Sequence, residues 1–540
     1  MANKNFTFYP IVVLAIACVF SIPVFAQQKS KPNILFIAID DLKPILGCYG
    51  NKLIKTPNID RLAKIGTVFM SNYCQQAVCG PTRASLMTGK RPDYTKVWDL
   101  KTPMRDVNPD ILSLPQYLIT QGYSTQGIGK VYDQRDVDKD LDLPSWSVPY
   151  YKSADEYFDK KTGKLVLGQY QSPATKATYD SLVKVATDKG LDKKDSKAFV
   201  DENIKPTTEC IDVPDNAYED GANVYKSLDL LVNLSKSKQP FFFAVGIHKP
   251  HLPFVAPKKY WDLYNREDMP LASYQEKSKN SVDLAYHDAG EIRKYTDIEP
   301  LLSYTDQKDF GITLPLDKQK ELIHGYYAAI SYTDALVGML LNRLDSLGLT
   351  KNTIVILWGD HGWHLGDHNL WCKHTNFEQA THTPLIISVP GLKPNKTNAT
   401  TEFIDIFPTL CDLTGVAIPS ILDGKSLVPL MKNPTATFKD FAVSQYPRVG
   451  DKDEAKKYGF SNSKNMGYSI RNGRYRFTIW MGDDFRSTQP FQERLVVGRE
   501  LYDYEKDPDE TVNVVNEKEY SNISKELNSK MMDFFKTQIK

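Results

Sequence analysis

The sequence feature that most constrains the fold is a set of short apolar runs, each followed closely by acidic residues or histidine. Such runs are typical of strands that are buried on both faces of a parallel sheet. They span residues 33–39, 241–246 and 353–358, and they lead to Asp40-Asp41, to His248 and to Asp360-His361, respectively. Because ligands bind beyond the carboxyl ends of the strands in open α/β sheets, these three ends together predict a functional site.

Helical patterns lie between the predicted strands. The longest runs from residue 316 to 347, directly after Pro315, and its apolar residues recur with the helical period. A further apolar run at 385–389 predicts another strand. Strands that alternate with helices indicate an α/β fold with a mixed, mostly parallel sheet flanked by helices. Residues 135–220 are polar and weakly periodic, and we expect insertions and surface loops there.

A smaller α+β domain is predicted after the α/β domain. Residues 432–435 have the composition of a linker, 466–470 and 475–480 are typical of short strands, and 517–540 predict a terminal amphipathic helix. The predicted organisation is a leader at 1–26, a large α/β domain at 27–432 and, at 437–540, a smaller domain with a short antiparallel sheet and a terminal helix.

The N-terminus has the features of a secretory signal peptide. Lys4 is its only charge, residues 9–20 are apolar, and Val24 and Ala26 suit a cleavage site. A transmembrane anchor is the alternative, which the short apolar run and Pro23 disfavour. We therefore expect an exported protein, periplasmic or secreted (lysosomal if the source is animal), with no stable membrane span after cleavage.

Composition excludes several classes of protein. Lys and Arg number 67 against 66 Asp and Glu, so the net charge of +1 gives no general attraction to nucleic acid, and we expect no nucleic-acid partner. Hydrophobic residues make up 41% of the chain, which excludes whole-chain disorder. Seven cysteines, one of them in the predicted leader, are too few for a disulfide scaffold, although a Cys74–Cys79 disulfide stays open.

Residues 79–90, CGPTRASLMTGK, form the most informative stretch of the chain. Pro81 suits the first turn of a helix and Gly89 its end, which places Cys79 at a helix N-terminus. Free N–H groups and the helix dipole attract anions there, and Arg83, one turn later, projects toward the same point. Position alone leaves two interpretations of Cys79, a thiolate of low pKa or a packed, buried cysteine.

The pattern Cys-x-Pro-x-Arg followed by Thr-Gly-Lys resembles the signature of the type I, formylglycine-dependent sulfatases, in which the cysteine is oxidised after synthesis to formylglycine. Gly80 and Thr82 stand where that family more often has Ser or Ala and Ser, respectively. Within the family the resemblance is closest to the iduronate-2-sulfatases. It rests on segments 88–93, 246–251, 360–366, 444–447 and 466–471, and it covers nearly the whole chain after the leader. The resemblance implies an alkaline-phosphatase-like α/β fold and hydrolysis of sulfuric esters.

The resemblance also implies a metal site made of Asp40, Asp41, Asp360, His361 and the modified Cys79. Three converging carboxylates require a divalent cation, and oxygen ligands favour Ca²⁺ or Mg²⁺. We expect one divalent cation, with Ca²⁺ as the first choice, although a histidine ligand is unusual for Ca²⁺. A lone Asp-Asp pair is more often a solvated turn, but two acidic ends of buried strands favour the metal site.

The same resemblance implies a route for cleavage of a sulfate ester. The aldehyde hydrates to a geminal diol, and one hydroxyl, made acidic by the metal and deprotonated by Asp360, attacks sulfur. Arg83, Lys130 and Lys373 would neutralise the sulfuryl oxygens. His248 would protonate the leaving alcohol with the help of Lys373, after which the second hydroxyl expels sulfate.

Asp133 is a departure from the family pattern. Residues 129–133 match a family segment that usually has histidine at the position of Asp133, and that histidine deprotonates the second hydroxyl. All nine histidines lie at position 248 or later, so no substitute is near in sequence. Three interpretations follow: Asp133 is the base for sulfate release, another residue takes that role, or turnover is altered. A fourth is that Asp133 is simply a residue of a surface loop.

Two further residues are candidates for substrate binding. Trp363 would shape the substrate pocket, and Lys464 would meet a uronate carboxylate by resemblance to the iduronate enzymes, although a solvated lysine fits that position equally well. Four histidines also cluster in sequence, and pocket or core positions explain them better than a metal; they are His364, His368, His374 and His382.

We therefore predict an enzyme, a sulfatase that hydrolyses a sulfate ester of an acidic sugar or glycosaminoglycan fragment. Its partners would be a sulfated saccharide substrate and a formylglycine-generating or equivalent enzyme that matures Cys79. One rival is a phosphomonoester or phosphonate hydrolase of the same superfold, and the single set of metal ligands argues against its two-metal form. The other is a non-catalytic binding protein for sulfated glycans, which only the departure at Asp133 supports.

Overall fold

A computed structural model describes residues 1–3, 31–152, 158–159, 164–165, 169–301, 311–449, 464–482 and 492–537. The predicted leader at 1–26 lies almost entirely outside these residues. Pro32–Lys540 form one compact unit. Among the helices of the described residues, none has the length and apolar character needed to cross a membrane.

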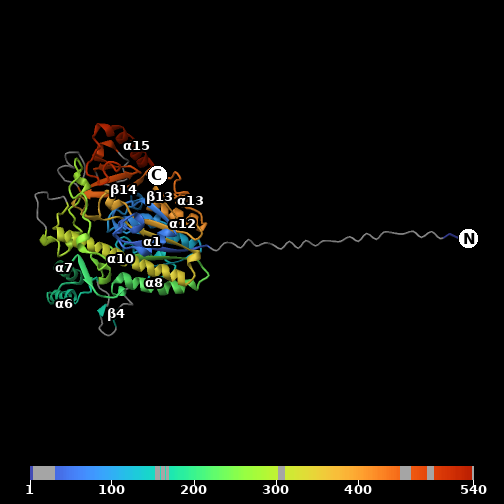
Figure 1. Ribbon diagram of the computed structural model, residues 1–540, viewed down its shortest axis with the longest axis horizontal. Coiled ribbons are helices and arrows are strands. Elements are labelled where there is room, and N and C mark those ends of the chain that lie inside the picture. The colour runs from blue at the N-terminus through green and yellow to red at the C-terminus, as the bar shows by residue number, and fades with distance from the viewer. Residues whose placement is uncertain are drawn as a thin grey trace. The chain divides into compact units, whose positions relative to one another are not determined.

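A sheet forms the centre of this unit (Figure 1). It has seven strands in the order β13-β2-β12-β9-β1-β7-β3. β1 (Asn33–Ile39) pairs in parallel with β7 (Phe241–Ile247) on one side and with β9 (Thr353–Gly359) on the other. β3 (Ser124–Gly129) extends the parallel part beyond β7. The three strands predicted to end at the functional site are therefore confirmed as neighbours.

The other side of the sheet contains its antiparallel pairs. β12 (Leu385–Ser388), the fourth predicted strand, runs antiparallel to β9 and to β2 (Thr67–Tyr73). β13 (Asn395–Glu402) then pairs in parallel with β2. The sheet is thus mixed and mostly parallel, as the sequence predicts, and the chain has an alkaline-phosphatase-like α/β fold.

Two hydrophobic cores cover the two faces of the sheet, because successive side chains of a strand point to opposite faces. Leu35 and Ile37 of β1 belong to one core, and Ile34 and Phe36 belong to the other. The helices that contribute to the first core include α1 (Pro57–Lys64), α8 (Glu219–Ser235) and α10 (Leu316–Ser346), and those that contribute to the second include α2 (Cys79–Thr88), α5 (Leu114–Thr120) and α12 (Ile406–Thr414). Burial of each such aliphatic side chain contributes about 1.5–3 kcal/mol to stability.

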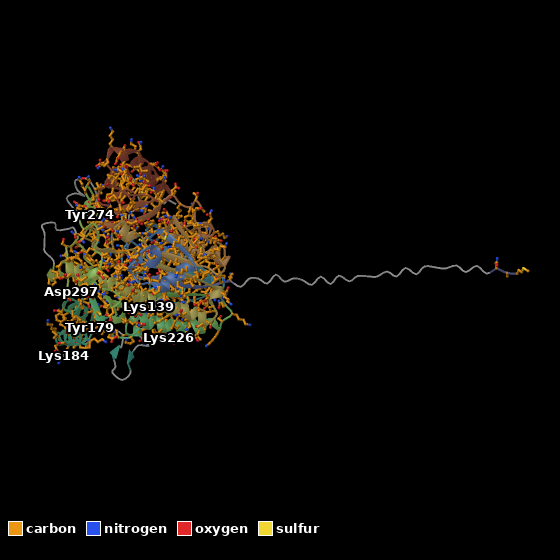
Figure 2. All side chains as sticks on the ribbon, in the orientation of Figure 1. Lys139, Tyr179, Lys184, Lys226, Tyr274 and Asp297 are labelled. Atoms are coloured by element: carbon orange, nitrogen blue, oxygen red, sulfur yellow. The ribbon has the colours of Figure 1, made fainter. Side chains whose placement is uncertain are left out.

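Residues 135–220 differ from the predicted loops, because they contain two helices, α6 (Pro173–Asp188) and α7 (Lys193–Asn203). Their N-termini are capped by Ser172 and Asp192, whose side chains accept backbone N–H groups. Ala186 is the only buried residue of α6, and Tyr179 and Lys184 point outward from it (Figure 2). An exposed helix needs no apolar stripe, which explains why periodicity alone did not reveal it.

A second, four-stranded antiparallel sheet lies in the C-terminal part of the chain. Its strands are β14 (Ala442–Val449), β15 (Lys464–Arg471), β16 (Tyr475–Met481) and β17 (Val496–Asp503). The terminal helix α15 (Ser521–Thr537) packs against this sheet in a third core. These elements confirm the two strands and the helix expected there, whereas the domain limits at 432 and 437 stay a prediction.

Shorter elements complete the described chain. The helices are α3 (Pro92–Thr95), α4 (Met104–Val107), α9 (Lys258–Trp261), α11 (Glu378–Thr381) and α13 (Val428–Lys432), and the strands are β4 (Phe158–Asp159), β5 (Lys164–Leu165), β6 (Thr208–Ile211), β8 (Phe254–Pro257), β10 (His364–Leu365) and β11 (Trp371–Cys372).

Candidate active site

Three buried carboxylates meet at the ends of two adjacent strands. Asp40 and Asp41 follow β1 directly, and Asp360 follows β9, the parallel neighbour of β1. None of the three is accessible to solvent. The backbone N–H of Asp41 donates to Oδ1 of Asp360 at 2.9 Å, which ties the two strand ends together.

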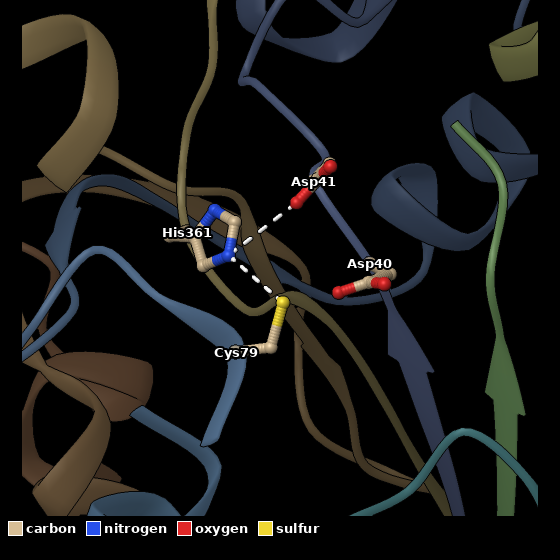
Figure 3. Close-up of side chains that lie close together, drawn as sticks. All are labelled: Asp40, Asp41, Cys79 and His361. Atoms are coloured by element: carbon tan, nitrogen blue, oxygen red, sulfur yellow. Dashed lines mark hydrogen bonds and ion pairs between the residues drawn. The ribbon is translucent and has the colours of Figure 1, made fainter. Parts of the chain in front are cut away.

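Cys79 opens α2, as predicted, and the helix ends at Gly89 with a φ of 63°. The Sγ atom of Cys79 lies 3.5 Å from Nε2 of His361, and the same nitrogen lies 3.4 Å from Oδ1 of Asp41 (Figure 3). Together with Asp40, these side chains offer four potential ligand atoms that all lie within 4.8 Å of one another. The structure therefore brings four of the five predicted metal ligands into one group.

Asp360, the fifth predicted ligand, lies beside that group. Its Oδ1 is 3.6 Å from Nε2 of His361 and also accepts the backbone N–H of His361 at 3.0 Å. Its Oδ2 accepts from Nε of Arg83 at 3.0 Å. Asp360 thus links the metal-ligand group to the arginine of the motif.

Three basic side chains surround the carboxylates. Arg83 is fully buried and its Nη2 lies 2.9 Å from Asp360 and 3.3 Å from Asp40, while its Nη1 donates to backbone carbonyls after β3. Lys130 forms an ion pair with Asp40. Nζ of Lys373 lies 2.9 Å from Oδ1 of Asp41. All three predicted sulfuryl-binding cations are therefore held at the carboxylate cluster.

The acid–base properties of the carboxylates test whether the residues fit a metal ion. Burial raises the pKa of Asp41, and burial together with the charge of Asp40 raises the pKa of Asp360 to about 7. Burial would also raise the pKa of Asp40, but Lys130 and Arg83 outweigh it and lower that pKa. Burial thus disfavours the ionised forms of Asp41 and Asp360 even with the three basic side chains beside them. A divalent cation fits the oxygen-rich donor set and would favour the ionised carboxylates.

The environment of Cys79 separates the two interpretations of this residue. Burial, followed by the charge of Asp40, raises the pKa of its thiol well above the ordinary value, so the protein groups do not favour a thiolate despite the helix N-terminus. The six cysteines in the described residues are all unpaired, which excludes the Cys74–Cys79 disulfide. Cys79 is thus a buried thiol inside a polar site.

His248 follows β7 and is held through its backbone. The buried carboxylate of Asp220 accepts the N–H groups of His248 at 2.8 Å and of Lys249 at 2.7 Å. His248 is an exposed residue, and desolvation by nearby protein atoms, followed by the charge of Lys130, lowers the pKa of its imidazole. Gly246 of β7 packs closely against the backbone of Lys130, which follows β3, and a Cβ atom on residue 246 would lie 2.1 Å from that backbone. The glycine therefore lets the ends of β7 and β3 come together.

Asp133 is buried rather than exposed on a surface loop. Its oxygens accept from Nε and Nη2 of Arg135, each at 2.8 Å, and Nζ of Lys130 lies 3.8 Å away. Burial alone would raise the pKa of Asp133, but these two cations lower it. Asp133, where the sequence resemblance leads us to expect histidine, is therefore an ionised carboxylate that is already paired.

The predicted substrate-binding residues lie in different surroundings. Trp363 is fully buried, with Nζ of Lys373 5.0 Å from the centre of its ring. Lys464 opens β15 opposite Val449, directly after residues 450–463, which lie outside the described residues. The ring of Trp363 thus lies next to the ammonium group of Lys373. The roles of Trp363 and Lys464 in substrate binding stay predictions.

Glu291 and His251 are site residues that the sequence analysis missed. Oε1 of Glu291 lies 3.1 Å from Lys373 and 3.2 Å from Nε2 of His251, which in turn lies 3.8 Å from Asp41. Oε2 of Glu291 lies 3.6 Å from His374. Glu291 comes from a segment of short 3₁₀ turns without a periodic pattern, so no sequence signal indicates it.

Comparison with known families agrees with this geometry. The profile of the sulfatase family matches residues 32–416, and the profile of the N-sulphoglucosamine sulphohydrolase C-terminal region matches residues 366–537. The chain therefore belongs to the sulfatase family and is a sulfuric ester hydrolase.

Individual relatives support the same assignment. Human iduronate 2-sulfatase is 32% identical over 542 residues, which cover 90% of this chain and 91% of the human protein. Among solved structures, an enzyme in complex with its substrate D-glucosamine-2-N,6-O-disulfate superposes with a TM-score of 0.67 at 21% identity, over 94% of this chain and 98% of the other. A phosphonate monoester hydrolase of Agrobacterium radiobacter gives a TM-score of 0.66 at 21% identity, over 94% and 96% of the two chains. At these identities the two structures show the fold alone.

Proposed function

We propose that this sulfatase removes a sulfate ester from an acidic sugar or glycosaminoglycan fragment, after Cys79 has been converted to formylglycine by a maturation enzyme. One observation carries the proposal: Cys79, Asp40, Asp41 and His361 converge within one buried group that Arg83, Lys130 and Lys373 surround. The similarity to human iduronate 2-sulfatase supports a uronate-containing substrate.

Asp40, Asp41, Asp360, His361 and the modified residue 79 would hold one divalent cation, for which we propose Ca²⁺. When bound, the cation and the hydrated aldehyde together supply a nucleophilic hydroxyl at neutral pH. A buried thiol with a raised pKa is a poor nucleophile by itself, which favours conversion of Cys79 over direct use of the thiol.

The chain's own residues have distinct tasks in this proposal. Arg83 fixes Asp40 and Asp360, and Lys130 and Lys373 present positive charge to the sulfuryl oxygens. His248, whose backbone is fixed by Asp220, would donate a proton to the leaving alcohol once an anionic sulfate ester beside the ring favours its charged form. His248 is an exposed residue at the end of β7, where a sugar can reach it.

The substrate class can be tested by comparing esters with the same leaving group. We expect matured protein with Ca²⁺ to release 4-nitrophenol from the sulfate ester at least tenfold faster than from the phosphate ester or the phenylphosphonate. A preference for either phosphorus ester would favour the phosphohydrolase alternative, and binding of sulfated disaccharides without release of sulfate would favour a binding protein. Export rests on the predicted leader, and detection of the chain without residues 1–26 outside the cytoplasm would support it.

A further inference from the structure

The turn that follows Lys130 lies against the helix that carries Cys79. The backbone N–H of Asp136 donates to the carbonyl of Asp133 at 3.1 Å and closes the turn. A Cβ atom placed on Gly80 would lie 1.3 Å from Oδ2 of Asp136. The turn can therefore pack this closely only because residue 80, directly after Cys79, is glycine.

Arg135 is an exposed residue of this turn, and its guanidinium group is fixed by hydrogen bonds. Asp133, which is buried, accepts from Nε and Nη2 of Arg135 at 2.8 Å each and from its backbone N–H at 3.1 Å. Two parallel hydrogen bonds to one carboxylate define the plane of a guanidinium group. The Arg135 side chain nevertheless keeps 47% of its surface exposed.

The outer edge of this guanidinium group is available to a ligand. Its Nη1 has no hydrogen-bond acceptor among the described residues. A planar cation with donors directed outward matches the oxygen atoms of a carboxylate or a sulfate group. Lys130 pairs with Asp40 of the carboxylate cluster and also lies beside Asp133. Arg135, on the exposed side of Asp133, is therefore linked to the cluster through Asp133 and Lys130.

We propose that Arg135 binds a second anionic group of the substrate, a carboxylate or a further sulfate on the sugar next to the scissile ester, and that Asp133 is a positioning residue for Arg135. This inference rests on the proposed function, since it names a further contact of the same substrate. Asp133 then orients a guanidinium group at the place where relatives carry histidine, and it does not act as the proton acceptor of sulfate release.

The test compares acidic and neutral substrates in Arg135→Gln, with Arg474→Gln as the matched control. Arg474 donates to Asp503 through the same two atoms at 2.8 and 2.7 Å and is 36% exposed, but it lies in the turn between β15 and β16. The substrates are 4-nitrophenyl sulfate, a monosulfated disaccharide with a uronate carboxylate, the same disaccharide with that carboxyl group reduced, and a disulfated disaccharide without a carboxylate.

We expect Arg135→Gln to raise KM at least about tenfold more for an acidic disaccharide than for 4-nitrophenyl sulfate, since it removes one charge-assisted hydrogen bond. Arg135→Lys should recover part of the loss, and Arg474→Gln should leave the ratio unchanged. A selective loss with the uronate identifies the carboxylate as the ligand, and a selective loss with the disulfated sugar identifies the second sulfate. Equal losses on all four substrates, or none, would overturn the proposal.

Two further measurements separate this inference from its alternatives. Asp133→Asn should show the same selective rise in KM, whereas a base role for Asp133 predicts a burst of free alcohol followed by slow turnover on every substrate. Calorimetric titration of the acidic disaccharide into Cys79→Ala and Cys79→Ala/Arg135→Gln, with Ca²⁺ present, does not depend on turnover. Absence of sulfate release by the matured protein would then contradict the proposed function. Equal affinities of the two Cys79→Ala variants for the acidic disaccharide would contradict the role of Arg135.

Discussion

The sulfur atom of Cys79 lies 3.5 Å from Nε2 of His361, although 282 residues separate the two in sequence. His361 follows β9, and Cys79 opens α2 on the face of the sheet to which β1 contributes Ile34 and Phe36. The carboxyl ends of β1 and β9 thus meet the N-terminus of α2 at one place. The residue proposed to become the nucleophile and the residues proposed to hold the metal ion are therefore parts of a single site.

Chelation should lower both activity and stability, because Asp40, Asp41 and Asp360 are buried together. Ca²⁺ at about 100 times its dissociation constant should stabilise the protein by about 2.7 kcal/mol, measured by thermal unfolding with and without EDTA. Asp40→Asn should abolish turnover and most of this stabilisation. Asp503→Asn, which alters a carboxylate that pairs with Arg474 and is not part of the metal-ligand group, should keep both. Equal unfolding temperatures with EDTA and with saturating Ca²⁺ would argue against the metal site.

Asp220 should affect catalysis through His248, because its carboxylate accepts the backbone N–H of His248 at 2.8 Å and that of Lys249 at 2.7 Å. Asp220→Asn offers only one oxygen for these two donors, so we expect kcat to fall about tenfold or more with a much smaller change in KM. The control is Asp215→Asn, which removes a buried carboxylate bonded to Lys259 and Tyr260 instead. A lower unfolding temperature with unchanged kcat would restrict Asp220 to a structural role.

Gly80→Ala should destabilise the protein, since the added methyl group would meet Oδ2 of Asp136 at 1.3 Å. Overpacking of this kind costs about 1–3 kcal/mol, which equilibrium denaturation can measure. The double variant Gly80→Ala/Asp136→Ala should regain most of the lost stability because the colliding carboxyl group is gone. If the second substitution restores nothing, residues 80 and 136 are not in the contact described above.

Asp136 should also make stability depend on pH. Burial, together with the charge of Asp133, raises its pKa to about 8, and both carboxyl oxygens lack a hydrogen-bond partner in the described structure. In the unfolded chain the pKa is about 4, so the folded state binds the proton more tightly, and the stabilisation is complete below pH ~4 and lost as the pH rises through 8.

Denaturant unfolding at pH 6 and pH 8.5 checks this sign. The wild-type protein should lose roughly 2–3 kcal/mol more than Asp136→Asn between the two values, because the amide does not titrate. Identical losses in the two proteins would show that Asp136 is ionised in the folded state at both pH values.

Local patterns in the sequence are sufficient to predict the strands that end at the site. Residues 33–39 are apolar throughout because β1 is buried on both faces, and the prediction needs no knowledge of its partners. The direction of β12 was not predictable in this way, since pairing with β9 and β2 decides it. The exposed helix α6 gave no stripe because only Ala186 is buried.

The candidate site also contains residues that local sequence patterns predict and residues that only tertiary contacts reveal. Cys79, Arg83 and the strand-end carboxylates were predicted because each belongs to a short motif with its own chemistry. Glu291 lies 82 residues from its partner Lys373 and has no motif, so only the folded chain reveals it. The close approach of the Asp136 carboxylate to Gly80 depends on a missing Cβ atom, which is a tertiary relationship that no spacing along the chain expresses.

The state of Cys79 provides the most direct test of the central claim. Protein should be made with and without a formylglycine-generating enzyme, the fraction of converted residue 79 measured by peptide mass spectrometry, and sulfate release measured on the same samples with Ca²⁺ present. The account predicts that turnover is proportional to the converted fraction and that Cys79→Ala, which keeps the buried packing, has none. Full sulfate release by protein whose Cys79 is entirely unmodified thiol would contradict it.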